Sequence, residues 1–308
     1  MRKKITVIGA GNVGATTAQL IAKDGLADVV LYDIIEGIPQ GKALDIAEAC
    51  PLWGSSVSVK GTNSYDDTGD SDIVVITAGF PRKPNMSRDD LLHANAGVVK
   101  AAADAIAKTS PNSIIIVVTN PMDAMAQLAW KTTEFSCRRV MGMGGILDSS
   151  RFRTFLAWEL NVSPEDIETI ILGGHGDQMV PIPRFTTVKG IPVSELLKKS
   201  KIDALLKRTS SGGAEIVGLL KTGSAYYAPA AAVLQMVKSI INDEKRMLPC
   251  AVYLNGEYGV KDLYVGVPVI LGKDGVERVV EIKLVKEEKT LFKESCVSVR
   301  KLIKKLAI

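Results

Sequence analysis

The stretch Ile5-Thr6-Val7-Ile8-Gly9-Ala10-Gly11-Asn12-Val13-Gly14 decides the fold of this 308-residue chain. A short, mostly apolar run opens it, and a helical pattern over residues 15–23 follows its last glycine. The spacing G-x-G-x-x-G between a strand and a helix is typical of a turn that binds the pyrophosphate of a dinucleotide. The first glycine makes the turn, the second lets phosphate approach the backbone, and the third lets the helix pack on the strand. We therefore expect cofactor contacts from Gly9, Ala10, Gly11, Asn12, Val13 and Gly14.

Asp33 supports this interpretation and indicates which dinucleotide binds. It ends the next apolar run, residues 29–32, and lies 19 residues after Gly14. A carboxylate at this point accepts hydrogen bonds from the adenosine ribose hydroxyls and repels a 2′-phosphate. No arginine follows it, since the next residues are Ile34-Ile35-Glu36. The pattern favours NAD over NADP. The alternative is a glycine turn that binds no ligand.

The first half of the chain alternates strands and helices. Apolar runs at 5–8, 29–32, 57–59, 73–76 and 114–118 predict strands, and helical patterns cover 15–23, 43–49 and 89–108. We expect Pro51 to end the second helix. Continuous apolar strands separated by helices indicate a parallel sheet covered on both faces. The prediction is an α/β fold whose residues 1–144 form a Rossmann-type, doubly wound, NAD-binding domain.

The second half has a different pattern. Long helices are predicted over 148–160, 193–208, 225–241 and 289–306. Two strands, 250–254 and 264–271, are expected to pair antiparallel through residues 255–257. We place a boundary near Gly144-Gly145 on this change of pattern, and predict an α+β domain for substrate binding and oligomerisation over 145–308.

Charge and composition exclude several classes of protein. A net charge of +4 is too small for nucleic-acid binding by bulk electrostatics. No apolar run approaches the roughly 18 residues that a membrane span needs, and the N-terminus does not resemble a signal peptide. The four cysteines include no Cys-x-x-Cys pair, which favours reduced thiols, no metal site and no disulfide framework. We expect a cytoplasmic protein without nucleic-acid or membrane partners.

One of only two histidines is the best candidate for acid–base chemistry. His175 lies in Gly173-Gly174-His175-Gly176-Asp177, directly after the apolar residues of 167–172. A strand thus carries it into a glycine-lined turn, and imidazole, with a pKa of about 6.5, exchanges protons near neutrality. The alternative is a structural histidine that caps a turn.

Three arginines are candidates for binding a carboxylate, because the guanidinium group is a permanent, forked donor. Arg82 and Arg88 lie in the segment 80–90, which follows a strand and contains two prolines, so it could act as a lid over a ligand. Arg151 lies three residues after Asp148 on one helix face. The alternatives are a solvated basic loop and an ordinary surface ion pair.

Five motifs in order resemble one family across nearly the whole chain. The sequence is similar to the lactate/malate dehydrogenases, and among them to the malate dehydrogenases built like lactate dehydrogenase. The matching residues are Gly9-Ala10-Gly11-Asn12-Val13-Gly14, the loop 80–91, Val118-Thr119-Asn120-Pro121, Leu147-Asp148-Ser149-Ser150-Arg151-Phe152-Arg153 and Gly174-His175-Gly176-Asp177. The resemblance implies NAD-dependent oxidation of malate to oxaloacetate, a role in the tricarboxylic acid cycle, and a homo-oligomer, with a tetramer favoured over a dimer.

The resemblance also implies a role for each candidate residue. His175 would be the acid/base and Asp148 would bond its other ring nitrogen. Arg151 would hold the C1 carboxylate, and Arg88 would polarise the reacting carbonyl. Further contacts to substrate or cofactor would come from Asn95, Val118, Thr119 and Asn120.

Arg82 would decide the substrate. Lactate dehydrogenases resemble this chain but carry a neutral glutamine at the matching place. Oxaloacetate has a second carboxylate that needs another positive charge, whereas pyruvate would leave Arg82 buried without a partner. Losing one partner of a buried charged pair costs about 3–5 kcal/mol. The alternatives are a lactate or broad 2-hydroxy-acid dehydrogenase and a non-catalytic NAD-binding protein.

Overall fold

A computed structural model describes residues 2–80 and 88–306, the side chain of Arg88 excepted. Its main feature is an eleven-stranded sheet in the order β3-β2-β1-β4-β5-β6-β12-β13-β8-β9, with β14 paired to β13. The first six strands in this order are mutually parallel. They are β1 (Lys4–Ile8), β2 (Asp28–Tyr32), β3 (Val59–Thr62), β4 (Ile73–Ile76), β5 (Ile114–Val117) and β6 (Val140–Met143). The predicted doubly wound parallel sheet is confirmed.

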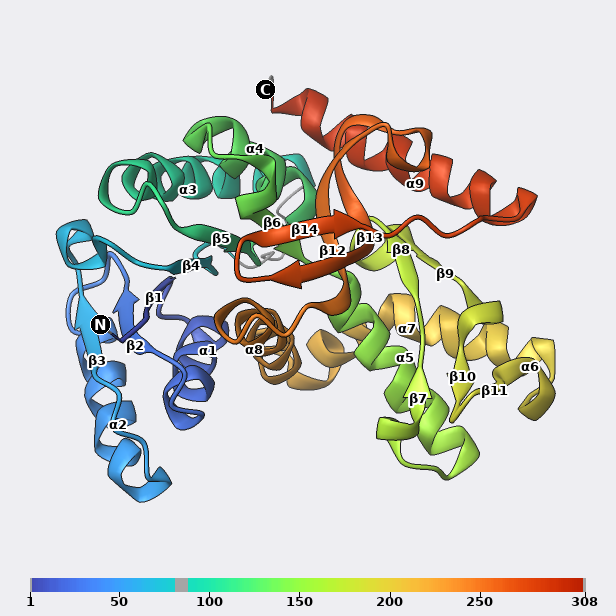
Figure 1. The fold of residues 1–308 in the computed structure, drawn as a ribbon, viewed down its shortest axis with the longest axis horizontal. Coiled ribbons are helices and arrows are strands. Elements are labelled where there is room, and N and C mark those ends of the chain that lie inside the picture. The colour runs from blue at the N-terminus through green and yellow to red at the C-terminus, as the bar shows by residue number, and fades with distance from the viewer. Residues whose placement is uncertain (1, 81–87, 307–308) are drawn as a thin grey trace.

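Helices cover both faces of this parallel sheet (Figure 1). One face carries α3 (Arg88–Thr109) and α4 (Met122–Thr133), and the other carries α1 (Asn12–Lys23) and α8 (Tyr227–Ile241). The side chains of β4 and β5 are all buried, which explains their unbroken apolar sequence. Helix α4 and strand β6 were not predicted; residues 122–129 of α4 and all four residues of β6 are buried, so neither element alternates between an apolar and a polar face.

Strand order reverses between β1 and β4, and this switch point places the glycine turn. The first strand leads into residues 9–11, and α1 begins at Asn12 rather than at the expected residue 15. Gly9 has φ +105°, which favours glycine, and a Cβ on Gly14 would lie 1.8 Å from the Gly9 carbonyl oxygen. The turn therefore requires glycine at both positions.

The second helix is longer than expected, and the prediction that Pro51 ends it was wrong. Helix α2 spans Ile38–Trp53 and contains Pro51 in its last turn. Proline there removes a single backbone hydrogen bond, and the helix closes two residues later on Gly54, which has φ +70°. The third strand is also shifted, to Val59–Thr62 instead of 57–59.

The second half extends the same sheet. Strand β12 (Arg246–Asn255) pairs with β6, and β13 (Lys261–Gly272) pairs antiparallel with β12 through the predicted connection. The remaining strands are short: β7 (Ile167–Glu168), β8 (Ile171–Gly173), β9 (Met179–Pro181), β10 (Thr187–Val188), β11 (Ile191–Pro192) and β14 (Gly275–Val279). Because the sheet continues from β6 into β12, the division at Gly144-Gly145 stays a prediction.

Four helices complete this half: α5 (Gly145–Leu160), α6 (Val193–Leu196), α7 (Lys199–Leu220) and α9 (Lys286–Lys305). The predicted single helix over 193–208 was wrong. A break at Leu197-Lys198 separates α6 from α7, which then continues to Leu220 through Gly212-Gly213. Glycine pairs usually disfavour a helix interior, so this one needs a packing reason.

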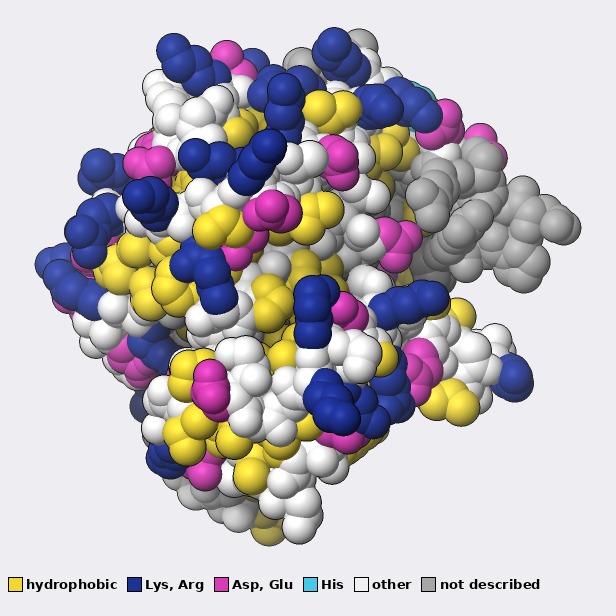
Figure 2. Space-filling view, turned by 90° about the vertical axis from the view of Figure 1, so that its right-hand side faces the viewer, with side chains coloured by type: hydrophobic (Ala, Val, Ile, Leu, Met, Phe, Trp, Pro, Cys, Tyr) yellow, Lys and Arg dark blue, Asp and Glu magenta, His cyan; other side chains and the backbone are white. Residues whose placement is uncertain are grey.

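On the face shown in Figure 2, lysine and arginine side chains are scattered among acidic and apolar ones. They form no continuous basic strip there. Among the described residues, none of the helices is long and apolar enough to cross a membrane. All four cysteines are free thiols, three of them buried.

Candidate active site

His175 lies in a tight turn between β8 and a short 3-10 helix, Gly176–Gln178. The residues on either side of the turn, Gly173 and Gly176, have φ of +84° and +78°. These angles favour glycine, and they explain why glycines surround the histidine in the sequence. The turn leaves 14% of the His175 side chain exposed, so its ring is shielded but accessible.

The His175 ring is held by Asp148 from α5. Its Nδ1 lies 3.0 Å from Oδ2 of Asp148, whose side chain is only 2% exposed. An ionised carboxylate accepts only, so Nδ1 carries the proton and Nε2 is free for exchange. Burial by itself would lower the pKa of His175, but the charge and hydrogen bond of Asp148 outweigh it, and the net effect raises that pKa.

Arg151 lies beside the same carboxylate. Its Nη1 is 3.5 Å from the second oxygen of Asp148, and its side chain is 12% exposed. Three buried polar atoms here lack a hydrogen-bond partner among the described residues: Asp148 Oδ1, Ser149 Oγ and Arg151 Nε. Unsatisfied buried polar atoms are rare in proteins and mark functional sites. Of these atoms, the Arg151 Nε and the Ser149 hydroxyl can donate to an anionic substrate, whereas the Asp148 oxygen can only accept.

Helix α7 makes room for Arg151. A Cβ on Gly212 would lie 3.1 Å from Cδ of Arg151, and one on Gly213 would lie 3.5 Å from its Nη2. The glycine pair that disfavours the helix therefore lets the guanidinium lie against its backbone. Sequence reasoning missed these two residues, although a Gly-Gly pair inside a helical pattern is a signal for close packing.

The glycine turn fits a dinucleotide. Gly11 is exposed, and no heavy atom lies within 4 Å of the place its Cβ would take. Oδ2 of Asp33 accepts a 2.7 Å hydrogen bond from the Ala10 N–H, which fixes the carboxylate at the edge of the turn. Lys42, which was not predicted, donates to the Ala10 carbonyl at 2.7 Å. The exposed backbone and anchored carboxylate are what NAD binding needs.

Residues 118–121 form a second segment with candidate contacts, at the carboxyl end of β5. Thr119 donates to the Ala78 carbonyl at 2.6 Å, while the side chain of Asn120 is exposed. Asn95, 1% exposed, accepts from the Phe80 N–H at 2.7 Å and donates to the Asn120 carbonyl at 2.7 Å. The side-chain amide of Asn95 therefore connects the backbone at Phe80 to the carboxyl end of β5. A direct cofactor contact by Asn95, Val118 or Thr119 stays a prediction.

The two loop arginines are not placed. Arg82 lies outside the described residues, and Arg88 is the first residue of α3 with its side chain also outside them. Their predicted roles stay predictions. The structure does bring three of the other candidates together: His175, Asp148 and Arg151 lie within one cluster.

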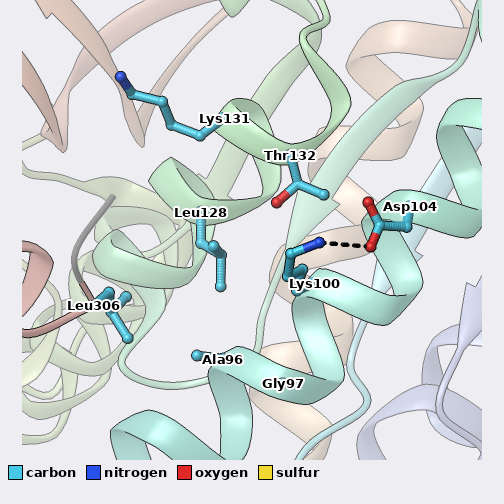
Figure 3. A pocket seen from close by; sticks show the side chains of 8 residues that line it. All are labelled: Ala96, Gly97, Lys100, Asp104, Leu128, Lys131, Thr132 and Leu306. Atoms are coloured by element: carbon cyan, nitrogen blue, oxygen red, sulfur yellow. Dashed lines mark hydrogen bonds and ion pairs between the residues drawn. The ribbon is translucent and has the colours of Figure 1, made fainter.

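A hollow of about 540 Å³ lies elsewhere, between α3, α4 and the end of α9 (Figure 3). It contains none of the candidate residues, and Lys100 on its wall is paired with Asp104 at 2.8 Å. Its lining is Ala96, Gly97, Lys100, Asp104, Leu128, Lys131, Thr132 and Leu306. Within the described part of the chain, no group of three or more metal-ligating side chains occurs.

Two domain models of a single family match nearly the whole chain. Residues 3–142 match the lactate/malate dehydrogenase NAD binding domain, and residues 146–307 match the family's alpha/beta C-terminal domain. The chain belongs to the lactate/malate dehydrogenase family, and its N-terminal half is an NAD-binding domain. The predicted family, fold and cofactor are thus confirmed.

Individual relatives are similar over nearly their full length. The chain is 57% identical to the malate dehydrogenase of Heliobacterium modesticaldum, covering 98% of each sequence. The crystal structure of Cryptosporidium parvum malate dehydrogenase is 46% identical with a TM-score of 0.97, covering 100% of this chain and 99% of that one. A lactate dehydrogenase from the same organism, complexed with lactic acid and NAD, is 43% identical with a TM-score of 0.95, covering 99% and 98%. Backbone similarity alone therefore does not separate the two activities.

Proposed function

We propose that this protein is an NAD-dependent malate dehydrogenase that interconverts (S)-malate and oxaloacetate. The type of reaction is inferred from one cluster of side chains. In this cluster, the carboxylate of Asp148 lies next to both the ring of His175 and the guanidinium of Arg151. An acid/base beside a cation suits a 2-hydroxy acid, because the hydroxyl group and the carboxylate of the substrate are adjacent. The preference for malate rests on the similarity to malate dehydrogenases and on Arg82.

His175 moves the proton in this reaction. Its unprotonated Nε2 takes the hydroxyl proton as malate is oxidised, and returns it when oxaloacetate is reduced. Asp148 stabilises the imidazolium and keeps the ring in the right tautomer. NAD, held by the turn Gly9–Gly14 and by Asp33, would supply the acceptor for the hydride of the hydroxyl-bearing carbon.

Arginines bind and polarise the substrate. Arg151 pairs with the C1 carboxylate, for which its buried, unpartnered Nε is a free donor. Arg88 stabilises the developing charge on the carbonyl oxygen, and Asn120 donates a hydrogen bond from the end of β5. Arg82 neutralises the second carboxylate. With pyruvate bound, Arg82 would lose this partner at a cost of about 3–5 kcal/mol. We therefore expect kcat/KM for pyruvate to be roughly two to three decades lower than kcat/KM for oxaloacetate.

The test is NADH oxidation with oxaloacetate and with pyruvate, side by side, giving kcat/KM for each. A preference of two decades or more for oxaloacetate supports the proposal. Comparable values would indicate a broad 2-hydroxy-acid dehydrogenase, and a preference for pyruvate would indicate a lactate dehydrogenase. NADH binding without turnover of either acid would indicate a non-catalytic protein.

We further propose that the enzyme acts in the cytoplasm, in the tricarboxylic acid cycle, as a homo-oligomer with a tetramer favoured. On α2, Leu44 and Leu52 are 61% and 87% exposed, and contact with a second copy of the chain would bury them. Light scattering coupled to size-exclusion chromatography measures the assembly. A monomer at micromolar concentration would contradict this proposal.

A further inference from the structure

Two peptide groups form the tip of the glycine turn, and the first of them is held on both sides. This is the peptide between Gly9 and Ala10. Its carbonyl accepts a 3.0 Å hydrogen bond from the hydroxyl group of Thr77, and its N–H donates to Oδ2 of Asp33 at 2.7 Å. Both of its polar groups have partners, so its orientation is fixed by β4 and by the end of β2.

The second peptide group, between Ala10 and Gly11, is held on one side only. Its carbonyl accepts a 2.7 Å hydrogen bond from the ammonium group of Lys42, whereas its N–H has no partner among the described residues. The carbonyl and the N–H point in opposite directions across a planar trans peptide. By holding the carbonyl, Lys42 therefore fixes the direction in which the Gly11 N–H points.

The Gly11 N–H lies at a position where glycine serves a ligand and not the fold. Gly11 has φ −66° and ψ −171°, extended backbone that any residue adopts, and no heavy atom lies within 4 Å of its added Cβ. The remaining reason for glycine is the close approach of the pyrophosphate to the backbone N–H groups at the start of α1. Lys42 thus orients an N–H group that the cofactor needs.

The position of Lys42 is set outside the turn. It lies in the second turn of α2, and the start of this helix packs tightly on β3, because a Cβ on Gly61 would lie 2.2 Å from the Pro39 carbonyl oxygen. From there the lysine side chain reaches back to Ala10, which is 32 residues earlier in the sequence. The packing of α2 on β3 therefore determines where the ammonium group stands.

The charge of Lys42 has no acidic partner. In the part of the chain that the structure describes, its half-buried ammonium group bonds only to the neutral Ala10 carbonyl. Lys60, by contrast, lies 2.6 Å from the carboxylate of Asp67, which neutralises it. An ammonium group without a carboxylate beside it attracts an anion, and the effect is strongest where water is partly excluded.

We propose that Lys42 is a positioning residue for the cofactor, which orients the Gly11 N–H toward the pyrophosphate of NAD and adds a positive charge beside the turn. The inference goes beyond the proposed function, because it rests on the NAD-binding domain and makes no use of the substrate. Asp33 and Lys42 then hold the two sides of Ala10 and serve neighbouring parts of the cofactor, the adenosine ribose and the phosphates.

Lys42→Met tests this proposal, since methionine keeps most of the apolar stem and removes the ammonium group. We expect the dissociation constant for NADH, measured by fluorescence titration without substrate, to rise by about 10-fold, as for the loss of one hydrogen bond to a charged group. The constant should also depend less on salt concentration than in the wild type, because one charge that salt screens is gone.

Fragments of the cofactor locate the effect. Competition against NADH gives dissociation constants for ADP, which contains the pyrophosphate, and for adenosine, which does not. Lys42→Met should weaken the binding of ADP by about the same factor as that of NADH. Adenosine binding should stay at the wild-type value, because the ribose still meets Asp33. A lysine that only stabilised the domain would affect both fragments equally.

Lys60→Met is the matched control. The ammonium group of Lys60 also donates to a single oxygen, Oδ1 of Asp67 at 2.6 Å, but it lies on β3 and makes no hydrogen bond to the glycine turn. The variant loses the same charge from the same domain. It should bind NADH, ADP and adenosine as the wild type does.

Four outcomes overturn the inference. They are wild-type affinity for NADH in Lys42→Met, an unchanged dependence of that affinity on salt, equal weakening of ADP and adenosine, and equal weakening of NADH by Lys42→Met and Lys60→Met. If the wild-type protein binds NADH but reduces neither oxaloacetate nor pyruvate, the proposed function fails, and the role of Lys42 is still decided by the binding data.

Discussion

The Cδ of Arg151 lies 3.1 Å from the place where a Cβ on Gly212 would stand. This distance is tighter than nine in ten real Cβ contacts, so with a larger residue at position 212 the Arg151 side chain must shift by a few tenths of an ångström. Arg151 in turn lies next to Asp148, which bonds His175. A backbone feature of α7 thus sets the position of the proposed carboxylate-binding group.

Gly212→Ala should therefore weaken substrate binding. We expect kcat/KM for oxaloacetate to fall by about 10-fold, less than the roughly 100-fold that a 1 Å misplacement can cost. The loss should fall mainly on KM, because the acid/base is not moved. Gly218→Ala is the control on the same helix, since nothing lies within 4 Å of its added Cβ. Equal kinetics for the two variants would argue against the role of Gly212.

Asp148→Asn should damage the acid/base without changing the shape of the site. An amide in place of the carboxylate removes the charge that raises the pKa of His175, and it can present an N–H to Nδ1 and select the wrong tautomer. In a serine protease, the same change of the buried aspartate behind the catalytic histidine lowers kcat by about 10⁴-fold, and we expect a loss in the same direction here. Stopped-flow kinetics with NADH and oxaloacetate will measure the loss. A decrease of less than about 10-fold would contradict the assigned role.

The pH dependence should have opposite signs in the two directions. The pKa of His175 is raised above 6.5, so the imidazolium form persists to a higher pH than in a free histidine. Reduction of oxaloacetate needs this protonated form, and its rate should fall as pH rises through that pKa. Oxidation of malate needs the neutral form, and its rate should rise over the same interval. Single-turnover rates in both directions, from about pH 5 to about pH 9, test this; a flat profile would exclude His175 as the acid/base.

Short sequence patterns correctly predicted those structural features that a single short segment of the chain forms by itself. The glycine turn and the turn at His175 each follow directly from a strand and its glycines, and both were predicted. The Asp123 carboxylate and the Ser295 hydroxyl accept backbone hydrogen bonds from the turn at His175, although they lie 52 and 121 residues away in the sequence, and Gly212 lies against Arg151 from another helix. Their roles arise only when α4, α7 and α9 pack around the turn. The same reason explains why the end of α7 was predicted wrongly, since that helix continues through two glycines that lie against Arg151.

Gly11 offers a test that separates cofactor binding from folding. Its Cβ would meet nothing within 4 Å, so Gly11→Val should leave the melting temperature of the free protein nearly unchanged. The added side chain occupies the space through which pyrophosphate approaches the backbone, and the dissociation constant for NADH should rise by at least 10-fold. Fluorescence titration measures it. Gly14→Val is the contrasting variant, because its Cβ would lie 1.8 Å from the Gly9 carbonyl oxygen and the turn itself should fail. Unchanged NADH binding in Gly11→Val would place the dinucleotide elsewhere.

We expect the substrate choice to depend on Arg82. In the proposed mechanism, Arg82→Gln removes the charge that would pair with the second carboxylate of oxaloacetate, and it also removes the unpaired charge that pyruvate would leave in a closed site. Both effects move the ratio of kcat/KM values toward pyruvate, by roughly two to three decades if the buried pairing is worth about 3–5 kcal/mol. Lys83→Gln is the matched control, because it makes the same change of charge one residue away in the same loop. A ratio that Arg82→Gln and Lys83→Gln shift equally would mean that the net charge of the loop, and not a specific pair at residue 82, selects the dicarboxylate.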